Sequence, residues 1–292
     1  MKIKNLFLLA ALGLMASATL TSCEDVLGHW EKPSPNPITP PSGGETPVTP
    51  EEIIYAFSLR NMADDADITA GLFKLTDQNG TEIAYATSDG KYTIKADDLS
   101  SVTTLWLEVT SNEDKKYIAK ATKEELQAIA EAGKLKMATL GDVILSDGTF
   151  AARLSTTGTK VAMIAYLGSE TDHATYKHGL ALALSDEASA MNWTTATGAS
   201  GAAAHTPAAP TTTSSWMLPS KDQWDKMIGT GGYGLANLKN TANGYTGLSG
   251  STTYWSSTEV NASLAWDFYA LNGNWYDYSK TTSDRVRACL AF

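Results

Sequence analysis

Aromatic and acidic side chains are concentrated in one short stretch of the chain, WDFYALNGNWYDY, at residues 266–278. Tyrosine provides a large, rigid contact area, while asparagine and aspartate provide hydrogen bonds that adapt to different partners. The dipeptide Asn272–Gly273 predicts a β-hairpin with a two-residue loop. A hairpin of this composition can recognise a ligand without a catalytic group, so binding is the first chemistry that the sequence indicates.

The predicted loop sets the register of the hairpin and places Tyr269 opposite Tyr276. Because side chains alternate between the two faces of a strand, one face is mostly apolar and the other is amphipathic. The apolar face, which we expect to be scaffold, consists of Trp266, Phe268, Ala270 and Trp275. The amphipathic face, which we expect to be solvent-exposed and to bind ligand, consists of Asp267, Tyr269, Leu271, Asn274, Tyr276 and Tyr278. The alternative is an ordinary surface whose tyrosines pack under the loop at residues 194–215.

Two clusters contain residue types that ligate metals. The first is the acidic turn DDAD at residues 64–67, which lacks the ligand spacing of an EF-hand loop. The second is formed by His173 and His178 with the acids at residues 170–172, and it matches no zinc spacing. We expect a solvated turn and surface histidines, and we predict no metal and no cofactor.

No catalytic arrangement of Ser, His and Asp or of Cys and His stands out. The glycine-rich stretch GTGGYG at residues 229–234 has no predicted strand before it and no predicted helix after it, so it does not indicate a nucleotide loop. The two cysteines, Cys23 and Cys289, have unrelated surroundings, and we expect the second to be a buried thiol. A net charge of −10 without a basic cluster argues against nucleic acid as a partner. We therefore expect a binding protein and not an enzyme.

The first residues form a targeting segment. A positive start is followed by the apolar run LFLLAALGLMA, which is short for a bilayer span, and by LTSC at residues 20–23. This ending resembles the lipobox of bacterial lipoproteins, in which the signal peptide (residues 1–22) is removed and Cys23 is lipidated. The acidic pair Glu24 and Asp25 resembles the surface-export signal of Bacteroidetes lipoproteins, which predicts an outer-membrane lipoprotein exposed on the cell surface and held by its lipid alone. The alternative is an ordinary secretory signal with a chance cysteine.

The rest of the chain divides into a tether and two predicted domains. Residues 23–51 are the tether, which contains seven prolines between residues 33 and 50. Residues 52–137 contain short alternating runs separated by turn signals and predict an all-β sandwich. One helix interrupts them, with a capping box in TKEE at residues 122–125 and a terminating glycine at residue 133.

Residues 138–292 predict a domain of mixed α and β structure. GDVILSDGTFA predicts two strands joined by a turn, and the apolar runs KVAMIAYLG and HGLALALSD predict buried strands. The low-complexity stretch at residues 194–215 predicts a long loop. Ser220 and Gln223 predict a second capping box at the start of a short helix.

Five segments of this domain carry a family resemblance: GDVILSDGTF, HGLALALSD, WMLPSKDQW, YWSSTE and RVRACLAF. Their order resembles that in the C-type lectin-like variable proteins of diversity-generating retroelements in Bacteroidetes, which are related in fold to the formylglycine-generating enzymes. The resemblance implies an α+β C-type lectin-like fold for residues 138–292 and mutagenesis of codons near the C-terminus that excludes Trp and Lys as products. Trp266, Trp275 and Lys280 would then be fixed scaffold, and Asn261 and Ser263 would join the variable binding face.

The resemblance does not imply sugar binding through calcium, because the motifs EPN, QPD and WND are absent from the sequence. It also does not imply formylglycine-generating activity, which uses a pair of cysteines. We expect a cell-surface adhesin that displays a diversified face to a protein or glycan ligand on another cell, phage or host surface. The alternative is a structural role as a tip or accessory subunit of a pilus, in contact with other pilus subunits.

Overall fold

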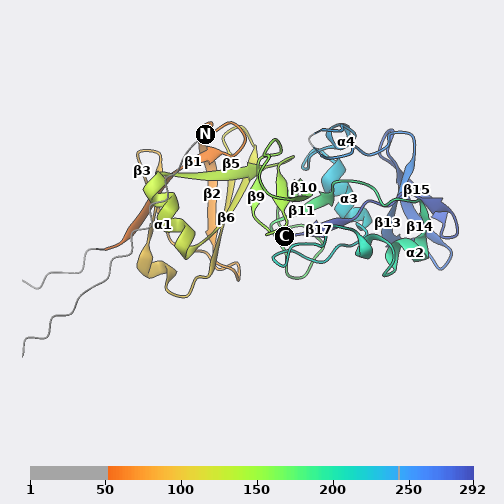
Figure 1. The fold of residues 1–292 in the computed structure, drawn as a ribbon, viewed down its shortest axis with the longest axis horizontal. Coiled ribbons are helices and arrows are strands. Elements are labelled where there is room, and N and C mark those ends of the chain that lie inside the picture. The colour runs from red at the N-terminus through yellow and green to blue at the C-terminus, as the bar shows by residue number, and fades with distance from the viewer. Residues whose placement is uncertain (1–51, 243) are drawn as a thin grey trace, which may run out of the picture. The chain divides into compact units, whose positions relative to one another are not determined.

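The computed structural model describes residues 52–242 and 244–292, which belong to one compact unit (Figure 1). The predicted signal peptide, the lipidated Cys23 and the tether to residue 51 lie outside the described residues. Within the described ranges, no helix is both long and apolar enough to cross a bilayer. The described chain is mostly β-sheet, so the β-rich prediction is confirmed.

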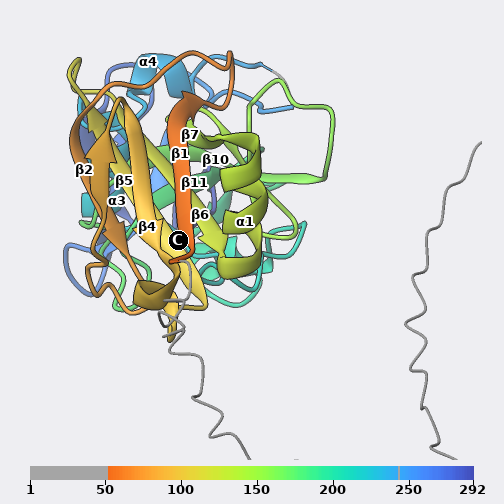
Figure 2. The same cartoon turned by 90° about the vertical axis from the view of Figure 1, so that its left-hand side faces the viewer.

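Residues 52–139 build a seven-stranded sheet with one helix at its side (Figure 2). The strands are β1 (Ile54–Asn61), β2 (Ala70–Thr76), β3 (Ala86–Ser88), β4 (Lys91–Lys95), β5 (Thr104–Ser111), β6 (Lys116–Thr122) and β7 (Lys134–Thr139), and a 3-10 turn, η1, covers Ala96–Leu99. Their order in the sheet is β2-β5-β6-β7-β1-β4-β3, and the pair β1–β7 is parallel. The strands form one continuous sheet that curls over its core, since Phe73 of β2 stacks on Tyr92 of β4 with ring centroids 4.2 Å apart.

Helix α1 (Lys123–Ala132) begins and ends where the sequence predicts. The side chain of Thr122 accepts from the backbone of Glu125, the side chain of Glu125 accepts from the backbone of Thr122, and both orphan donors are thereby satisfied. Gly133 ends the helix with φ +67°, a left-handed conformation that glycine adopts without strain. Leu126 buries the inner side of the helix, which packs on β1, β6 and β7.

The rest of the chain contains a buried five-stranded sheet in the order β17-β11-β10-β8-β9. These strands are β8 (Val143–Leu145), β9 (Phe150–Ala151), β10 (Lys160–Leu167), β11 (Gly179–Ala183) and β17 (Cys289–Ala291). Neighbouring strands are antiparallel, and β10 and β11 are buried on both faces, as their continuous apolar runs predict. On the outer side of β17, Met217 and Cys289 exchange backbone hydrogen bonds of 2.9 Å, so the C-terminal strand is internal.

The remaining elements surround a three-stranded sheet in the order β13-β14-β15. Its strands are β13 (Thr253–Glu259), β14 (Leu264–Tyr269) and β15 (Asn274–Ser279). Around it lie β12 (Met191–Asn192), α2 (Trp193–Thr197), η2 (Ala202–Ala204), α3 (Lys221–Ile228), α4 (Leu235–Leu238) and β16 (Ser283–Asp284). The second predicted capping box, between Ser220 and Gln223, is present at the start of α3.

The stretch at residues 194–215 differs from the predicted structureless loop. It contains most of α2 and all of η2, and two of its alanines are packed against the core: Ala196 is 1% exposed and Ala202 is 0% exposed. The indole of Trp216 donates to the carbonyl of Pro207 at 2.8 Å and holds the returning chain. The small side chains let this segment lie close to its neighbours. Its low sequence complexity therefore predicted a structureless loop where the chain is packed.

Candidate functional site

The hairpin of β14 and β15 forms with a different register from the predicted one. Tyr269 pairs with Asn274 instead of Tyr276, so residues 270–273 form the turn. A type I′ turn needs positive φ at both central residues, but in this turn only Gly273 has it, with φ +80°. Pairing is displaced by two residues, from Tyr276 to Asn274, and an even displacement leaves each side chain on its predicted face.

Ala270 explains the longer turn. Its side chain is 0% exposed, and its N–H donates to the carbonyl of Thr252 at 3.0 Å, on the side of β13. The residue therefore leaves the ladder with β15. The N–H groups of Asn272 and Gly273 both point to the carbonyl of Tyr269, at 3.3 and 2.8 Å. Burial of one small side chain outweighs the local preference of the Asn-Gly dipeptide.

The predicted scaffold face packs on α3. Phe268 is fully buried, lies edge-on to Trp224 with centroids 4.7 Å apart, and stacks on Tyr254. Trp275 is half-buried beside Phe268, and its indole N–H donates to Asp225 of α3 at 2.8 Å. The ammonium of Lys221 lies 4.6 Å from the Trp275 ring centroid, a cation–π contact on the same helix. This face fixes the position of the exposed edge strand.

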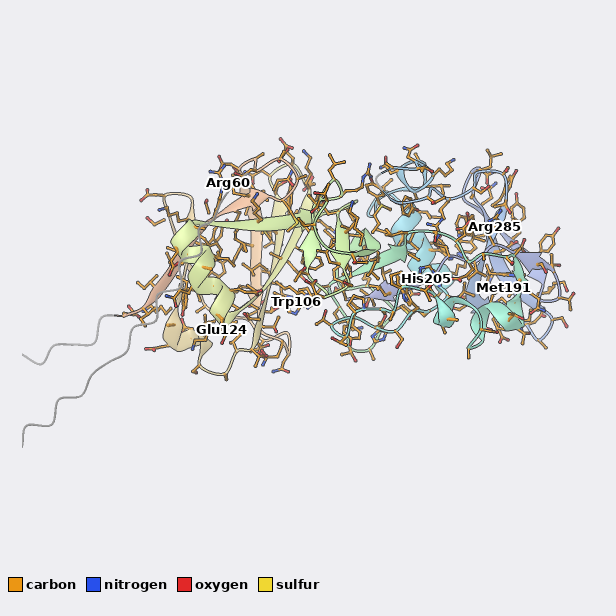
Figure 3. The ribbon with its side chains drawn as sticks, in the orientation of Figure 1. Arg60, Trp106, Glu124, Met191, His205 and Arg285 are labelled. Carbon is orange, nitrogen blue, oxygen red and sulfur yellow. The ribbon has the colours of Figure 1, made fainter. Side chains whose placement is uncertain are left out.

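The predicted binding face is divided, and the prediction for Asp267 is wrong. Asp267 is 0% exposed because β13 lies on the other side of β14 and places the fully buried Trp255 opposite it. The indole of Trp255 donates to the carbonyl of Met191 at 2.9 Å, and Met191 is labelled in Figure 3. Strand β12 and its neighbours thus cover the β14 half of the face, where Tyr269 is half-buried.

The β15 half of the face is open to solvent. The exposed fractions are 57% for Leu271, 44% for Tyr276 and 49% for Tyr278, and Asn274 is also exposed. We call these four residues the β15 edge patch. Within the described chain no strand pairs with the outer edge of β15, and the two tyrosines are not covered by residues 194–215 as the alternative required.

The other two predicted site residues lie in the turn before β14. Asn261 and Ser263 are both exposed. The side-chain oxygen of Asn261 accepts from the N–H groups of Ser263 and Leu264 at 2.8 and 3.0 Å, so this side chain holds the turn. Leu264 pairs with Ser279, next to Tyr278, which places the turn at the far end of the β15 edge patch from Leu271.

A buried carboxylate pair lies behind the patch and was missed by sequence reasoning. Asp267 is the cross-strand partner of Tyr276, and its neighbour Asp284 is 9% exposed. Both oxygens of Asp267 and one of Asp284 lack a hydrogen-bond partner among the described residues, while the hydroxyl of Thr253 donates to the other Asp284 oxygen. Burial, and then the charge of Asp284, raise the pKa of Asp267 to about 7. Burial also raises the pKa of Asp284.

Residues of the two clusters with metal-ligating side chains form ion pairs or hydrogen bonds with other side chains of the protein. Asp65 accepts from Lys134 at 3.0 Å, which lowers the pKa of its carboxyl, and Asp67 pairs with Arg60 at 3.1 Å. His178 contacts a glutamate, Glu108, at 2.6 Å. In the described part of the chain no group of three or more His, Cys, Asp and Glu side chains could hold a metal ion.

Cys289 is a buried thiol, as the sequence predicts. Its side chain is 0% exposed, and burial raises its pKa above the usual range of a thiol. Burial and the raised pKa together keep the sulfur in the unreactive thiol form, so Cys289 contributes packing to the core that surrounds β17.

Of the comparisons with known proteins, the comparison with solved structures gives matches. The chain matches no protein family model, and no curated protein matches it. The crystal structure of a fimbrial protein from Bacteroides ovatus is similar over 82% of this chain and 71% of that protein, with a TM-score of 0.42 and 13% sequence identity.

Proposed function

We propose that this protein is a surface-displayed ligand-binding protein, an adhesin that contacts its ligand through the β15 edge patch. The observation that carries the proposal is the pair Tyr276 and Tyr278, which stand side by side on the open face of an edge strand while the opposite face of that strand is held by α3. Tyrosines of this kind gain contact area on binding at a small cost in side-chain entropy. The proposed ligand is a protein or glycan on another cell, phage or host surface.

The rigid support of the β15 edge patch favours a role in ligand binding. A binding surface is strongest when its residues are already held in their bound positions, because less conformational freedom is lost on association. Phe268 and Trp275, on the face opposite the patch, hold the hairpin against α3. The turn stabilised by Asn261 fixes one end of the hairpin. The exposed side chains can change without disturbing this support, which suits the diversified face of a C-type lectin-like variable protein.

The proposed attachment to the cell is the lipid on Cys23, followed by the proline-rich tether. Cys23→Ala should release the protein from the membrane fraction, and unchanged membrane attachment would refute lipidation. The proposed diversification has its own test in the neighbouring DNA: a near-identical repeat that differs at adenines, beside a reverse transcriptase gene. Absence of both would remove the variable-protein part of the proposal and leave the binding site to be tested by itself.

The binding site is tested with a double variant, Tyr276→Ala with Tyr278→Ala. Binding of the wild-type chain is first mapped on a glycan array and on a panel of bacterial and host cells. The double variant should lose at least tenfold in apparent affinity for every positive spot or cell type. Tyr85→Ala is the matched control, because Tyr85 is a tyrosine of similar exposure, 40%, that lies just before β3 and outside the β15 edge patch. Unchanged binding by the double variant would place the site elsewhere.

A second candidate function is that of a fimbrial subunit. It is favoured by the open edge of the seven-stranded sheet. Strand β3 ends the sheet, all three of its residues are exposed, and its outer edge has no partner in residues 52–242 and 244–292. An open edge of this kind can accept a strand from another chain. Thr87→Pro would remove a backbone donor from this edge, and loss of the protein from purified fimbriae in that variant would support the role. Absence of the wild-type protein from fimbriae would exclude it.

A further inference from the structure

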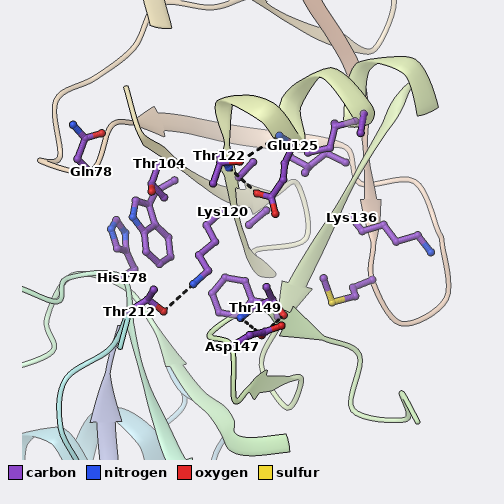
Figure 4. A pocket seen from close by; sticks show the side chains of 18 of the residues that line it. Gln78, Thr104, Lys120, Thr122, Glu125, Lys136, Asp147, Thr149, His178 and Thr212 are labelled. Atoms are coloured by element: carbon purple, nitrogen blue, oxygen red, sulfur yellow. Dashed lines mark hydrogen bonds between the residues drawn. The ribbon is translucent and has the colours of Figure 1, made fainter. Parts of the chain in front are cut away.

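A cleft of about 880 Å³ lies among β6, α1, β7 and the β8–β9 turn (Figure 4). Its walls include Trp106, Ile129, Leu135 and Phe150. Small-molecule sites in proteins have volumes of roughly 300–1,000 Å³ and are mostly apolar, with a few polar groups that orient the ligand. The cleft has the size and the lining of such a site.

Lys120 of β6 lies at the centre of this cleft (Figure 4). Its ammonium lies 5.7 Å from the ring centroids of both Trp106 and Phe150. It donates one hydrogen bond, to the hydroxyl of Thr212 at 3.1 Å, and it forms no ion pair with any carboxylate of the described chain. An ammonium has three protons to donate, so Lys120 can give further hydrogen bonds into the cleft.

Two carboxylates, those of Asp147 and Glu125, act on the charge of Lys120, and each accepts hydrogen bonds from another residue of its own turn. One oxygen of Asp147 accepts from both the N–H and the hydroxyl of Thr149, at 2.9 and 2.7 Å. Glu125 accepts from the N–H of Thr122 at 2.7 Å as part of the capping box of α1. Burial lowers the pKa of Lys120 more than these two acids raise it. An anion placed beside the ammonium would offset that cost of burial.

The surroundings of Trp106 argue against a sugar as the ligand of this cleft. Sugars bind by stacking on an open aromatic face, but the indole of Trp106 is covered on one face by His178, with ring centroids 3.9 Å apart. Lys120 lies over the same ring system. The charge also limits the anion. The other two lysines of the lining, Lys134 and Lys136, pair with Asp65, and the one ammonium and one hydroxyl that remain suit a single negative charge better than a phosphate dianion.

We propose that this cleft binds a small organic acid with one carboxylate and an apolar body. The carboxylate accepts hydrogen bonds from the ammonium of Lys120 and the hydroxyl of Thr212, and the apolar body lies against Ile129, Leu135 and Phe150. This site is independent of the β15 edge patch, and the ligand class does not depend on the proposed adhesion.

The test is calorimetric titration of residues 52–292 or of the full mature chain with octanoate, and in parallel with octanol as the neutral analogue. Octanoate should bind at one site, at least tenfold more tightly than octanol. Lys120→Met, which keeps the apolar stem and removes the charge, should abolish that preference. Lys91→Met is the control, because Lys91 is an exposed lysine of β4 outside the cleft, and it should bind octanoate as the wild type does.

Two more variants keep the test decisive if Lys120→Met folds poorly. Thr212→Val removes an exposed hydroxyl and should weaken octanoate severalfold, and Tyr276→Ala should not change it. Equal affinity for octanoate and octanol, or octanoate binding that Lys120→Met and Thr212→Val leave unchanged, would overturn the proposal. Absence of any octanoate binding to the wild-type chain would overturn it as well.

Discussion

Strands β14 and β15 belong to one hairpin and have similar compositions, yet their environments are opposite. β14 is the central strand, with β13 on one side and β15 on the other, and it is covered on both faces. β15 has one neighbour, and its outward side chains are exposed. The difference is largest for a cross-strand pair, since Asp267 is 0% exposed and its partner Tyr276 is 44% exposed. Exposure is thus set by what lies beside a strand, not by its own sequence.

The largest expected effect is the loss of packing on the central strand. Phe268→Ala should lower the free energy of unfolding by about 3–5 kcal/mol, because it leaves a cavity between Trp224 and Tyr254. Urea denaturation followed by tryptophan fluorescence measures the change. Tyr276→Ala on the edge strand is the comparison, and similar losses in the two variants would remove the distinction between the strands.

The next effect concerns the buried carboxyl of the central strand. Because the pKa of Asp267 is raised to about 7 in the folded state, the folded protein binds its proton more tightly than the unfolded chain. This contribution to stability is present in full below about pH 4 and is lost as the pH rises towards about 7. Asp267→Asn should therefore stabilise the protein at pH 8 by about 2–4 kcal/mol and flatten its pH dependence.

Thermal melts of wild type and Asp267→Asn between pH 4 and pH 8 measure this difference. Asp98→Asn is the control, since Asp98 is exposed in η1 and is not among the charges that act on Asp267, so it should give no comparable gain. A variant at position 267 that is less stable than the wild type at pH 8 would show that the charged carboxylate is stabilising, against the expectation.

A smaller effect is expected where the edge strand meets α3. Trp275→Phe keeps an aromatic ring but removes the hydrogen bond from the indole to Asp225, so it should cost about 1–2 kcal/mol. Trp266→Phe is the matched control on the same face, because the indole N–H of Trp266 has no acceptor within the described chain. Equal melting temperatures for the two variants would mean that the hydrogen bond contributes nothing to stability.

The smallest effect on stability is expected for an exposed side chain of the edge strand β15. Tyr278→Ala should change the free energy of unfolding by less than about 0.5 kcal/mol, as is usual for surface substitutions. If Tyr278 contributes strongly to recognition, the same variant should lose more than about 1–2 kcal/mol of binding free energy. Stability and binding are measured on one preparation, and a large loss of stability would show that Tyr278 is scaffold.

Local signals predicted much of the fold. Both capping boxes depend on residues three positions apart, and both helices begin where Thr122 and Ser220 predict. The buried strands β10 and β11 follow from continuous apolar runs. The faces of the hairpin also follow from alternation, which survives a register error of an even number of residues.

The sequence could not show which partners lie beside each element. The burial of Asp267 depends on β13, which pairs with β14, and its raised pKa depends also on Asp284 of β16; no local pattern in the sequence indicates either neighbour. The turn at residues 270–273 depends on a contact between Ala270 and Thr252. The cleft around Lys120 is lined by residues of β6, α1 and the β8–β9 turn. No sequence motif predicts that these elements lie next to one another.

Strand β7 connects regions that the sequence divides at residue 137. It runs from Lys134 to Thr139, and Ala138 of this strand shares a core with Ile118 on one side and Ile144 on the other. Removing residues 52–137 would therefore cut through a strand and expose apolar surface. We expect the region from residue 52 to residue 292 to melt in one cooperative transition, and a shortened display fragment beginning at residue 138 to aggregate, so selections for new binders should retain both regions.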